Sequence, residues 1–367
     1  MLNAFIVNRG DLLQQGKLSK PEMAWLRLGA GCAMLKICEQ KGVGDQFNAE
    51  QFYHLSLLMT DEVPQVRELF AAKLHKGLSK GIPNNRCLPL DFMGYYALAG
   101  QEPDKKIKTQ IRQHMISDIN KRREYIKTLP VWSSSGPTEK GMGQLAHILP
   151  DYMLVFAVPV LAHDPDFTTY DDVEQLTRMR QCLWFILEPL MTKNEFYCFG
   201  FYKNLIERMK NQKDALKGED DSMNYKLWAI CDLAMGIILS KTTNYEMKEF
   251  PADTRIPTMY FRRHEEPLWV NAKLYLPPEM QVNMNFHKCK DSTAGGVKLI
   301  SRGKVRGRPV KQQGVGINET DVKPSEASET KIQLPGMEEE CVSECDEPPA
   351  KRASVEHKLE PMQCVFV

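Results

Sequence analysis

The sequence lacks the residue patterns that mark common catalytic sites. It contains no G-x-S-x-G nucleophile elbow, no phosphate-binding P-loop, no glycine pattern of a dinucleotide-binding fold and no H-E-x-x-H zinc motif. Its eight histidines are dispersed along the chain. His163 stands beside Asp164 and Asp166, but these residues fit a turn between helices better than a metal site. We therefore expect no enzymatic activity, no metal and no cofactor.

Long apolar runs and closely paired cysteines are also missing. The most apolar stretch, residues 153–162, is far shorter than the roughly 20 residues that a membrane-spanning helix needs. The N-terminus carries no secretory signal. None of the ten cysteines forms a C-x-x-C pair, which favours reduced thiols in the cytosol or nucleus. We expect a soluble intracellular chain without membrane contact.

Charge is present in both signs but is unevenly distributed. The formal net charge is only +1, so the chain has no overall field that would attract nucleic acid. Any such binding must come from a local basic patch. The hydrophobic share of 43% supports a substantial core, and most of this share lies before residue 245. The core is therefore expected in that part of the chain.

Helical periodicity dominates after an irregular entry over residues 1–20. Residues 24–38 carry apolar side chains at three- and four-residue steps, as in Leu28, Cys32 and Leu35. A unit of helix, acidic or proline-containing turn, and second helix then recurs. The expected helix pairs are 48–59 with 64–78, 90–98 with 105–128, 149–162 with 172–191, and 195–213 with 225–241.

These repeated pairs indicate a helical-repeat solenoid, with a helical bundle as the competing architecture. The first two turns, at Asp61 and Asp104, are spaced as in HEAT or armadillo repeats of about 40–47 residues. One helix pair cannot bury its apolar face alone, whereas stacked pairs bury a continuous core and leave a surface for partners. We predict an all-α fold with three segments. They are HEAT-like repeats over 1–245, an extended closing segment over 246–284 and a disordered charged tail over 285–367.

The tail is basic first and acidic afterwards. Residues 287–311 hold eight lysines and arginines against a single acid, Asp291, and acids dominate over 318–347. A segment of this composition cannot bury enough apolar area to offset the entropy lost on ordering. This is the reason for predicting disorder there.

A short basic motif in the tail, residues 304–311, resembles an AT-hook. In its Arg-Gly-Arg-Pro core, two guanidinium groups flank a glycine whose missing side chain lets the backbone enter the narrow minor groove of A·T tracts. The flanking lysines would contact phosphates and make binding salt-dependent. The residues expected to contact DNA are Lys304, Arg306, Gly307, Arg308, Pro309 and Lys311. The alternative is a basic stretch of a solvated tail without a DNA partner.

Eight short strings in the helical region form an ordered set. They are Gln-Val-Arg at 65–67, Lys-Leu-His-Lys-Gly-Leu at 73–78, Leu-Pro-Leu at 88–90, Arg-Arg-Glu-Tyr at 122–125, Leu-Ala-His-Asp-Pro-Asp-Phe at 161–167, Cys-Leu-Trp-Phe at 182–185, Met-Thr-Lys-Asn-Glu at 191–195 and Tyr-Leu-Pro-Pro-Glu at 275–279. The set resembles the precocious-dissociation-of-sisters family, the HEAT-repeat regulators of sister chromatid cohesion. The strings occur in the family's order and with similar intervening lengths, which is far more specific than any single string.

The resemblance implies a non-catalytic scaffold that binds the cohesin ring through its SMC and kleisin subunits. It implies Wapl as a further partner, a place on chromatin in the nucleus, and a charged C-terminal tail with AT-hook-like sequences. Five basic residues of the matched strings are candidate partner contacts wherever they prove exposed: Arg67, Lys73, Lys76, Arg122 and Arg123. His163 and Asp164 are expected to be structural. The alternative function is that of a generic helical-repeat adaptor in another intracellular complex.

The chain also departs from the family pattern. Residues 79–87 and 129–147 differ from it, and the long N-terminal array through which the family engages Wapl is not in this sequence. We expect the chain to correspond to the C-terminal portion of a family member, as a fragment, a partial gene model or a shortened paralogue. Its first helix pairs would then present an apolar face without a polar cap, which tends to aggregate or recruit a partner.

Overall fold

The computed structural model describes residues 1–40, 47–80, 87–129, 148–192, 194, 197–247, 255–265 and 272–281. By its internal contacts the chain divides into two units, Met1–Lys298 and Leu299–Val367. All described residues belong to the first unit. The expected tail and its basic motif at 304–311 therefore lie outside the described residues.

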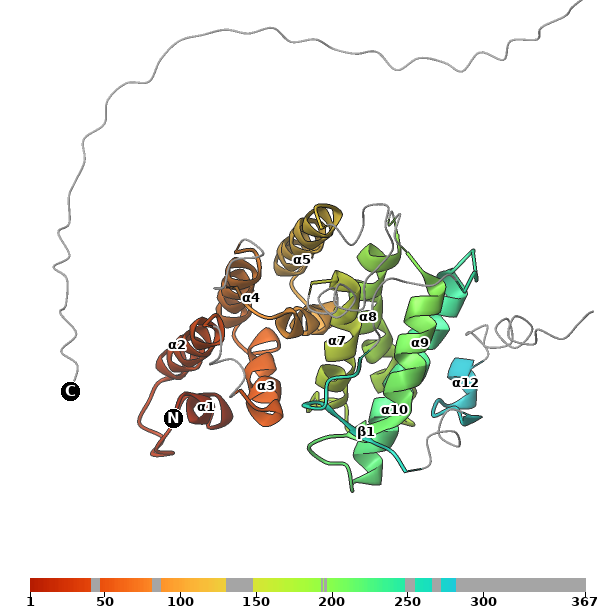
Figure 1. Ribbon diagram of the computed structural model, residues 1–367. Helices are drawn as coiled ribbons and strands as arrows, with labels where there is room; N and C mark the ends of the chain where they lie inside the picture. The colour runs from red at the N-terminus through yellow and green to blue at the C-terminus, as the bar shows by residue number, and fades with distance from the viewer. Residues whose placement is uncertain are drawn as a thin grey trace, which may run out of the picture. The chain divides into compact units, whose positions relative to one another are not determined.

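Consecutive helix pairs make up most of the described part of the first unit (Figure 1). The pairs in these ranges are α1 (Leu2–Val7) with α2 (Lys20–Cys38), α3 (Ala49–Ser56) with α4 (Pro64–Leu78), the 3₁₀ helix η3 (Leu90–Gln101) with α5 (Lys105–Lys127), α7 (Met153–Ala162) with α8 (Val173–Met191), and α9 (Phe199–Lys210) with α10 (Asp221–Lys241). Successive pairs pack on one another: α1 contacts α3, α2 contacts α4, α4 contacts α5, and α8 contacts both η3 and α10. The all-helical repeat architecture expected from the sequence is confirmed.

Two features differ from the sequence-based expectation, and both depend on contacts between distant residues. A six-residue helix, α1, forms within the segment expected to be irregular. It is too short to be stable alone, but it packs on α2 and α3, with Asn3 Nδ2 lying 3.1 Å from His54 Nδ1. The strands β1 (Gln212–Asp214) and β2 (Phe261–Arg263) form a small antiparallel sheet in which Lys213 pairs with Arg262. No local periodicity signals either element.

The acidic turns of the sequence begin the second helix of three pairs. The side chains of Asp104, Asp172 and Asp220 accept hydrogen bonds from the backbone N–H groups two and three residues further on, at 2.7–3.3 Å. Each cap satisfies N–H groups that have no partner within the helix and places a negative charge at the positive end of the helix dipole. Such a cap stabilises its helix by about 1 kcal/mol. Helix initiation thus explains why aspartate recurs at these turns.

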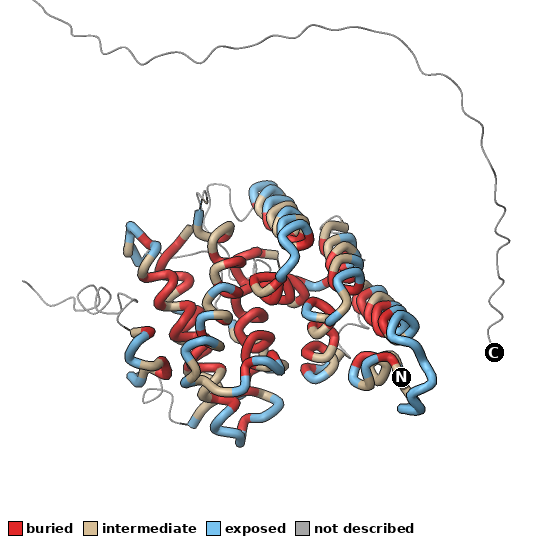
Figure 2. The backbone as a smooth tube through the Cα atoms, turned by 180° about the vertical axis from the view of Figure 1, so that it is seen from behind, coloured by how far each residue is buried: buried red, intermediate tan, exposed pale blue. Residues whose placement is uncertain are grey.

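Helix α7 lies in the core, where it packs against η3, α8 and α10, and every one of its residues is buried. The 3₁₀ helix η3 packs so closely against α7 and α8 that there is no room for a side chain at two of its glycines. A Cβ at Gly94 would lie 2.8 Å from the backbone carbon of Phe156, and one at Gly100 would lie 2.4 Å from the Cα of Cys182. Elsewhere, buried residues follow the inward faces of the helices and exposed residues the outward faces (Figure 2).

None of the helices in the described ranges is both long enough and apolar enough to cross a membrane.

Buried ion pairs connect the first three helix pairs. Arg27 on α2 donates to both carboxylate oxygens of Asp61, at 2.7 and 2.9 Å. Arg67 on α4 donates to both carboxylate oxygens of Glu102, at 2.7 and 2.8 Å, and to the backbone carbonyl of Asp61 at 2.7 Å. Glu102 in turn accepts from the backbone N–H of Asp104, the cap of α5, at 3.0 Å. We call Arg27, Asp61, Arg67 and Glu102 the ion-pair ladder.

The ladder is buried, since its four side chains are at most 9% exposed. The hydrogen bond from Asp61 raises the pKa of Arg27, and the hydrogen bond from Glu102 raises the pKa of Arg67, although burial acts in the opposite direction. Removing one partner of a buried pair is strongly destabilising because the other charge is left in the interior without hydration. The ladder therefore ties each second helix to the turn of the pair that follows.

We predict that Gly100→Ala destabilises the chain by about 1–3 kcal/mol, because the added methyl group collides with backbone and forces η3 away from α8. The matched control is Gly29→Ala, at an exposed position inside α2 where an added Cβ meets nothing within 4 Å. It should stabilise by about 0.5–1 kcal/mol. Chemical denaturation of the two variants measures both effects, and equal stabilities would contradict the close packing described above.

We also predict that Arg67→Ala lowers the free energy of unfolding by about 3–5 kcal/mol, because Glu102 is left as a buried, unpaired charge. Replacing both partners, as in R67M/E102L, should recover most of that loss. The control is Arg262→Ala, which breaks an exposed pair with Glu219 and should cost less than about 1 kcal/mol. A double variant as unstable as Arg67→Ala would show that the unpaired charge is not the cause.

Candidate partner-binding surfaces

The five basic residues that were candidate partner contacts differ in how far they are buried. Arg67 belongs to the ion-pair ladder, and Arg122 on α5 is only 3% exposed. Burial lowers the pKa of Arg122, while nearby groups, Asp118 among them, act in the opposite direction. Arg123 is half-buried and donates to the backbone carbonyls of two residues at the end of α8. The condition of exposure is met by Lys73 and Lys76, both on the outer face of α4.

Lys73 and Lys76 line a groove between α2 and α4 with a volume of about 350 Å³. The groove-lining residues are Cys32, Ala33, Leu35, Lys36, Glu39, Lys73, Lys76 and Lys80. We call this feature the α2–α4 groove. Leu35 is 2% exposed and belongs to the core below it. The groove thus combines apolar residues of α2 with four lysines.

Most of the lysines of the groove have no acidic partner among the described residues. Lys80 forms an ion pair with Glu39. Within the described residues, Lys36, Lys73 and Lys76 form no ion pair, and all three are exposed. This contrasts with buried cations such as those of the ladder, each of which meets an acid. Three adjacent ammonium groups without internal partners are available to bind an anionic group from outside.

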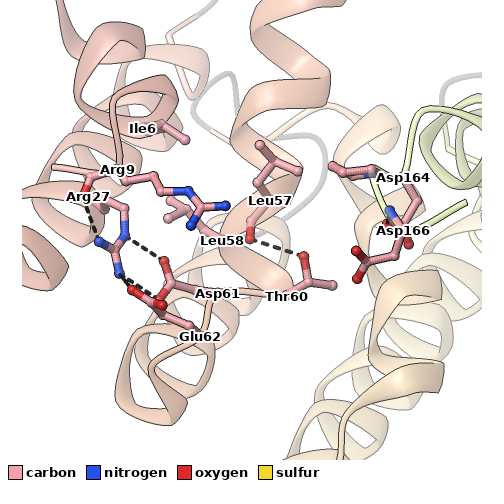
Figure 3. A pocket seen from close by; sticks show the side chains of 11 residues that line it. Ile6, Arg9, Arg27, Leu57, Leu58, Thr60, Asp61, Glu62, Asp164 and Asp166 are labelled. Atoms are coloured by element: carbon pink, nitrogen blue, oxygen red, sulfur yellow. Dashed lines mark hydrogen bonds and ion pairs between the residues drawn. The ribbon is translucent and has the colours of Figure 1, made fainter. Parts of the chain in front are cut away.

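A second hollow, of about 260 Å³, lies where the α1–α2 loop and the turn before α4 approach the turn before α8 (Figure 3). Three of its polar residues, Arg27, Asp61 and Asp164, have partners within the chain. Asp61 holds Arg27, and Asp164 accepts from the side chain of Gln101 at 3.2 Å and from the backbone N–H of Asp166 at 3.0 Å. Figure 3 shows Arg27 turned toward Asp61, away from Asp164 and Asp166 on the far wall. These contacts give Arg27, Asp61 and Asp164 structural roles in the walls of the hollow.

His163, which the sequence analysis assigned to structure, connects the turn after α7 to β1. Its Nε2 lies 2.8 Å from the Oδ2 of the buried Asp214, and its ring stacks on that of Tyr53 with centroids 3.8 Å apart. The Oδ1 of Asp214 accepts from the backbone N–H groups of Leu216 and Lys217 at 3.0 and 2.6 Å. These contacts hold three segments together, so the predicted structural role fits the geometry.

Two further histidines, His75 and His114, lie between α4 and α5. The rings of His75 and His114 stack with centroids 4.3 Å apart, and His75 lies 3.0 Å from the buried Asp118. Burial lowers the pKa of His114, and the neighbouring His75 adds to this effect. Across the described ranges, no group of three or more histidine, cysteine or acidic side chains could hold a metal ion.

The sequence analysis missed Lys36 and Lys80 as members of the basic groove. The spacing of Lys73, Lys76 and Lys80, at three- and four-residue steps, already places them along one face of a helix. The membership of Lys36 depends on α2 packing beside α4, which no local pattern reveals. The six tail residues expected to contact DNA lie outside the described residues.

Comparison with known proteins agrees with the resemblance noted in the sequence. The family model described as "Sister chromatid cohesion protein PDS5 protein" matches residues 1–262. PDS5 homolog B of Gallus gallus is 41% identical over 281 residues, which cover 77% of this chain and 19% of the relative. PDS5 homolog B of Homo sapiens is 40% identical, and the alignment covers 77% of this chain and 18% of the relative. PDS5 homolog A of Mus musculus is 36% identical, and the alignment covers 97% of this chain and 26% of the relative. The chain therefore spans about a fifth to a quarter of these relatives.

The match covers all five helix pairs described above and ends within β2. The relatives share more than a third of their aligned residues with this chain. The chain belongs to the PDS5 family of sister chromatid cohesion proteins.

Proposed function

We propose that this chain acts in sister chromatid cohesion as a non-catalytic scaffold that binds cohesin subunits on chromatin in the nucleus. The observation that carries the proposal is the family match over residues 1–262, together with relatives whose names all refer to sister chromatid cohesion. The SMC and kleisin subunits are the proposed partners, and Wapl is a further one. Because the relatives are about four times as long as this chain, the part that this chain plays is proposed from its own surfaces.

The geometry supports binding as the mode of action. In the described ranges, the buried acids and histidines hold segments of the fold together, as the ladder and the pair of His163 with Asp214 illustrate. The α2–α4 groove, in contrast, presents cations that serve no internal contact. Stacked helix pairs of this kind offer extended outer surfaces on which partners can bind. We place the partner contact at Lys73 and Lys76.

The expected result is that the tagged full chain enriches SMC and kleisin subunits from nuclear extract. A helical-repeat protein of similar length and charge, outside the PDS5 family, serves as the control and should enrich neither. Quantitative mass spectrometry of the eluates provides the measurement. Equal recovery with the control would contradict a role at cohesin and would favour a generic helical-repeat adaptor.

We further propose that residues 304–311 bind the minor groove of A·T-rich DNA. Arg308→Ala should weaken binding to an A·T-rich duplex by roughly tenfold or more, and binding to a G·C-rich duplex much less, because the narrow A·T groove attracts the guanidinium group. The control is Arg352→Ala, which removes the same charge outside the motif. Fluorescence anisotropy at several salt concentrations measures the affinities. An equal loss on both duplexes would reduce the motif to non-specific charge.

A further inference from the structure

The faces of α2 and α4 that border the α2–α4 groove change from apolar to basic along the helices, and their apolar part, at Trp25 and Leu69, adjoins the residues that line the groove. On α2, Trp25 precedes Cys32 by seven residues, or about two turns, and so lies on the same face of the helix as Cys32 and Lys36. On α4, Leu69 precedes Lys73 by four residues, or about one turn, on the same face. Each helix therefore presents an apolar residue first and a basic residue afterwards.

These two apolar residues are unusually accessible. Trp25 is 64% exposed and Leu69 is 38% exposed, although both are large hydrophobic side chains. Tryptophan is the side chain most enriched among those that dominate binding energy at protein interfaces. The two helices run in the same direction along the groove, because Arg27 pairs near the beginning of α4 and Glu39 pairs with Lys80 beyond its end. The apolar residues of both helices thus gather toward one end and the lysines toward the other.

We infer that the α2–α4 groove is a docking site for an acidic amphipathic helix of a partner protein. Its apolar side chains contact Trp25 and Leu69, and its carboxylates contact Lys36, Lys73 and Lys76. This inference rests on the proposed function only in that the chain acts by binding other proteins. It adds the chemistry of the partner segment, which no family name specifies.

Charge complementarity and spacing favour this occupant over others. Lys73 and Lys76 are three residues apart, or about 4.5 Å along the axis of α4, which matches carboxylates at positions i and i+3 of a helical partner. A helix that lays its apolar face into a groove between two helices is a recurrent mode of peptide recognition. Duplex DNA offers phosphates but no apolar face for Trp25 and Leu69, and a small anion would leave both uncovered.

The test uses the purified full chain and a fluorescent synthetic helical peptide. The peptide carries leucine and phenylalanine on the first turns of one face and glutamates at i, i+3 and i+7 on the later turns of that face. Two further peptides replace the glutamates by glutamine or the apolar residues by serine. We expect both replacements to weaken binding by roughly tenfold, measured by fluorescence polarisation at physiological salt.

Variants of the chain locate the contact. K73E/K76E and Trp25→Ala should each weaken binding of the original peptide by roughly tenfold or more. The matched control is K105E/K106E, which makes the same change of charge at two exposed lysines in the first turn of α5, and it should leave the affinity within about twofold. All variants change exposed side chains, and circular dichroism checks that they retain the helical fold.

Several outcomes would overturn the inference. They are equal binding of the glutamate and glutamine peptides, an equal loss in K73E/K76E and K105E/K106E, or no binding of the peptide to the unaltered chain. Displacement of the peptide by inorganic phosphate would show a simple anion site. Loss of duplex DNA binding in K73E/K76E, without loss of the peptide, would show a nucleic-acid surface.

The outcome for the groove is separable from the outcome for cohesin. If the unaltered chain and K73E/K76E enrich SMC and kleisin subunits equally, the cohesin proposal stands and the groove is not the contact. If the peptide binds as expected but no cohesin subunit is enriched, the groove is a docking site for a partner outside cohesin.

Discussion

The ion-pair ladder of Arg27, Asp61, Arg67 and Glu102 is the constraint on which the stacking of the first three helix pairs depends. Each arginine reaches from the second helix of one pair to an acid in the turn of the next, across 34 and 35 residues of sequence. A shift of one helix by a single turn would leave buried charges without partners, at a cost of about 3–5 kcal/mol each. The apolar core tolerates small displacements far better, because its contacts have no direction. The ladder therefore sets the register, and the core supplies most of the stabilisation.

The ladder also determines which charges are available to partners. Arg27 and Arg67 are engaged by the acids Asp61 and Glu102, and the turn that holds Glu102 also provides Asp104, which caps α5. Acidic residues are thus used at the beginnings of helices, whereas Lys36, Lys73 and Lys76, which form no ion pair with another described residue, lie toward the ends of α2 and α4. This distribution agrees with the helix dipole, which favours anions at helix beginnings and cations at helix ends. The α2–α4 groove is a consequence of this arrangement in two adjacent pairs.

Membership in the PDS5 family is the basis for the proposal that these surfaces act in sister chromatid cohesion. The chain matches only a part of each relative, so its contribution is best considered as that of a stack of helix pairs with particular outer faces. A stack of this kind needs no pocket to act, because binding energy comes from side chains spread over adjacent helices. We propose two separate roles for the two basic elements, protein binding for the α2–α4 groove and DNA binding for residues 304–311.

The sequence by itself determined those helices that are specified by residues close together in the chain. Apolar residues at helical spacing indicated the positions of α2, α4, α5, α8 and α10, and the expected starts of α5 and α8 agree with the structure to within one residue. Helix α10 begins at Asp221, four residues before its expected start, because Asp220 caps it. Only the tertiary structure decided which basic residues are exposed. Arg67 and Lys73 lie on the same helix and are both cations, yet one is buried against Glu102 and the other faces solvent. Local periodicity describes one helix at a time, whereas burial depends on which distant segments become its neighbours.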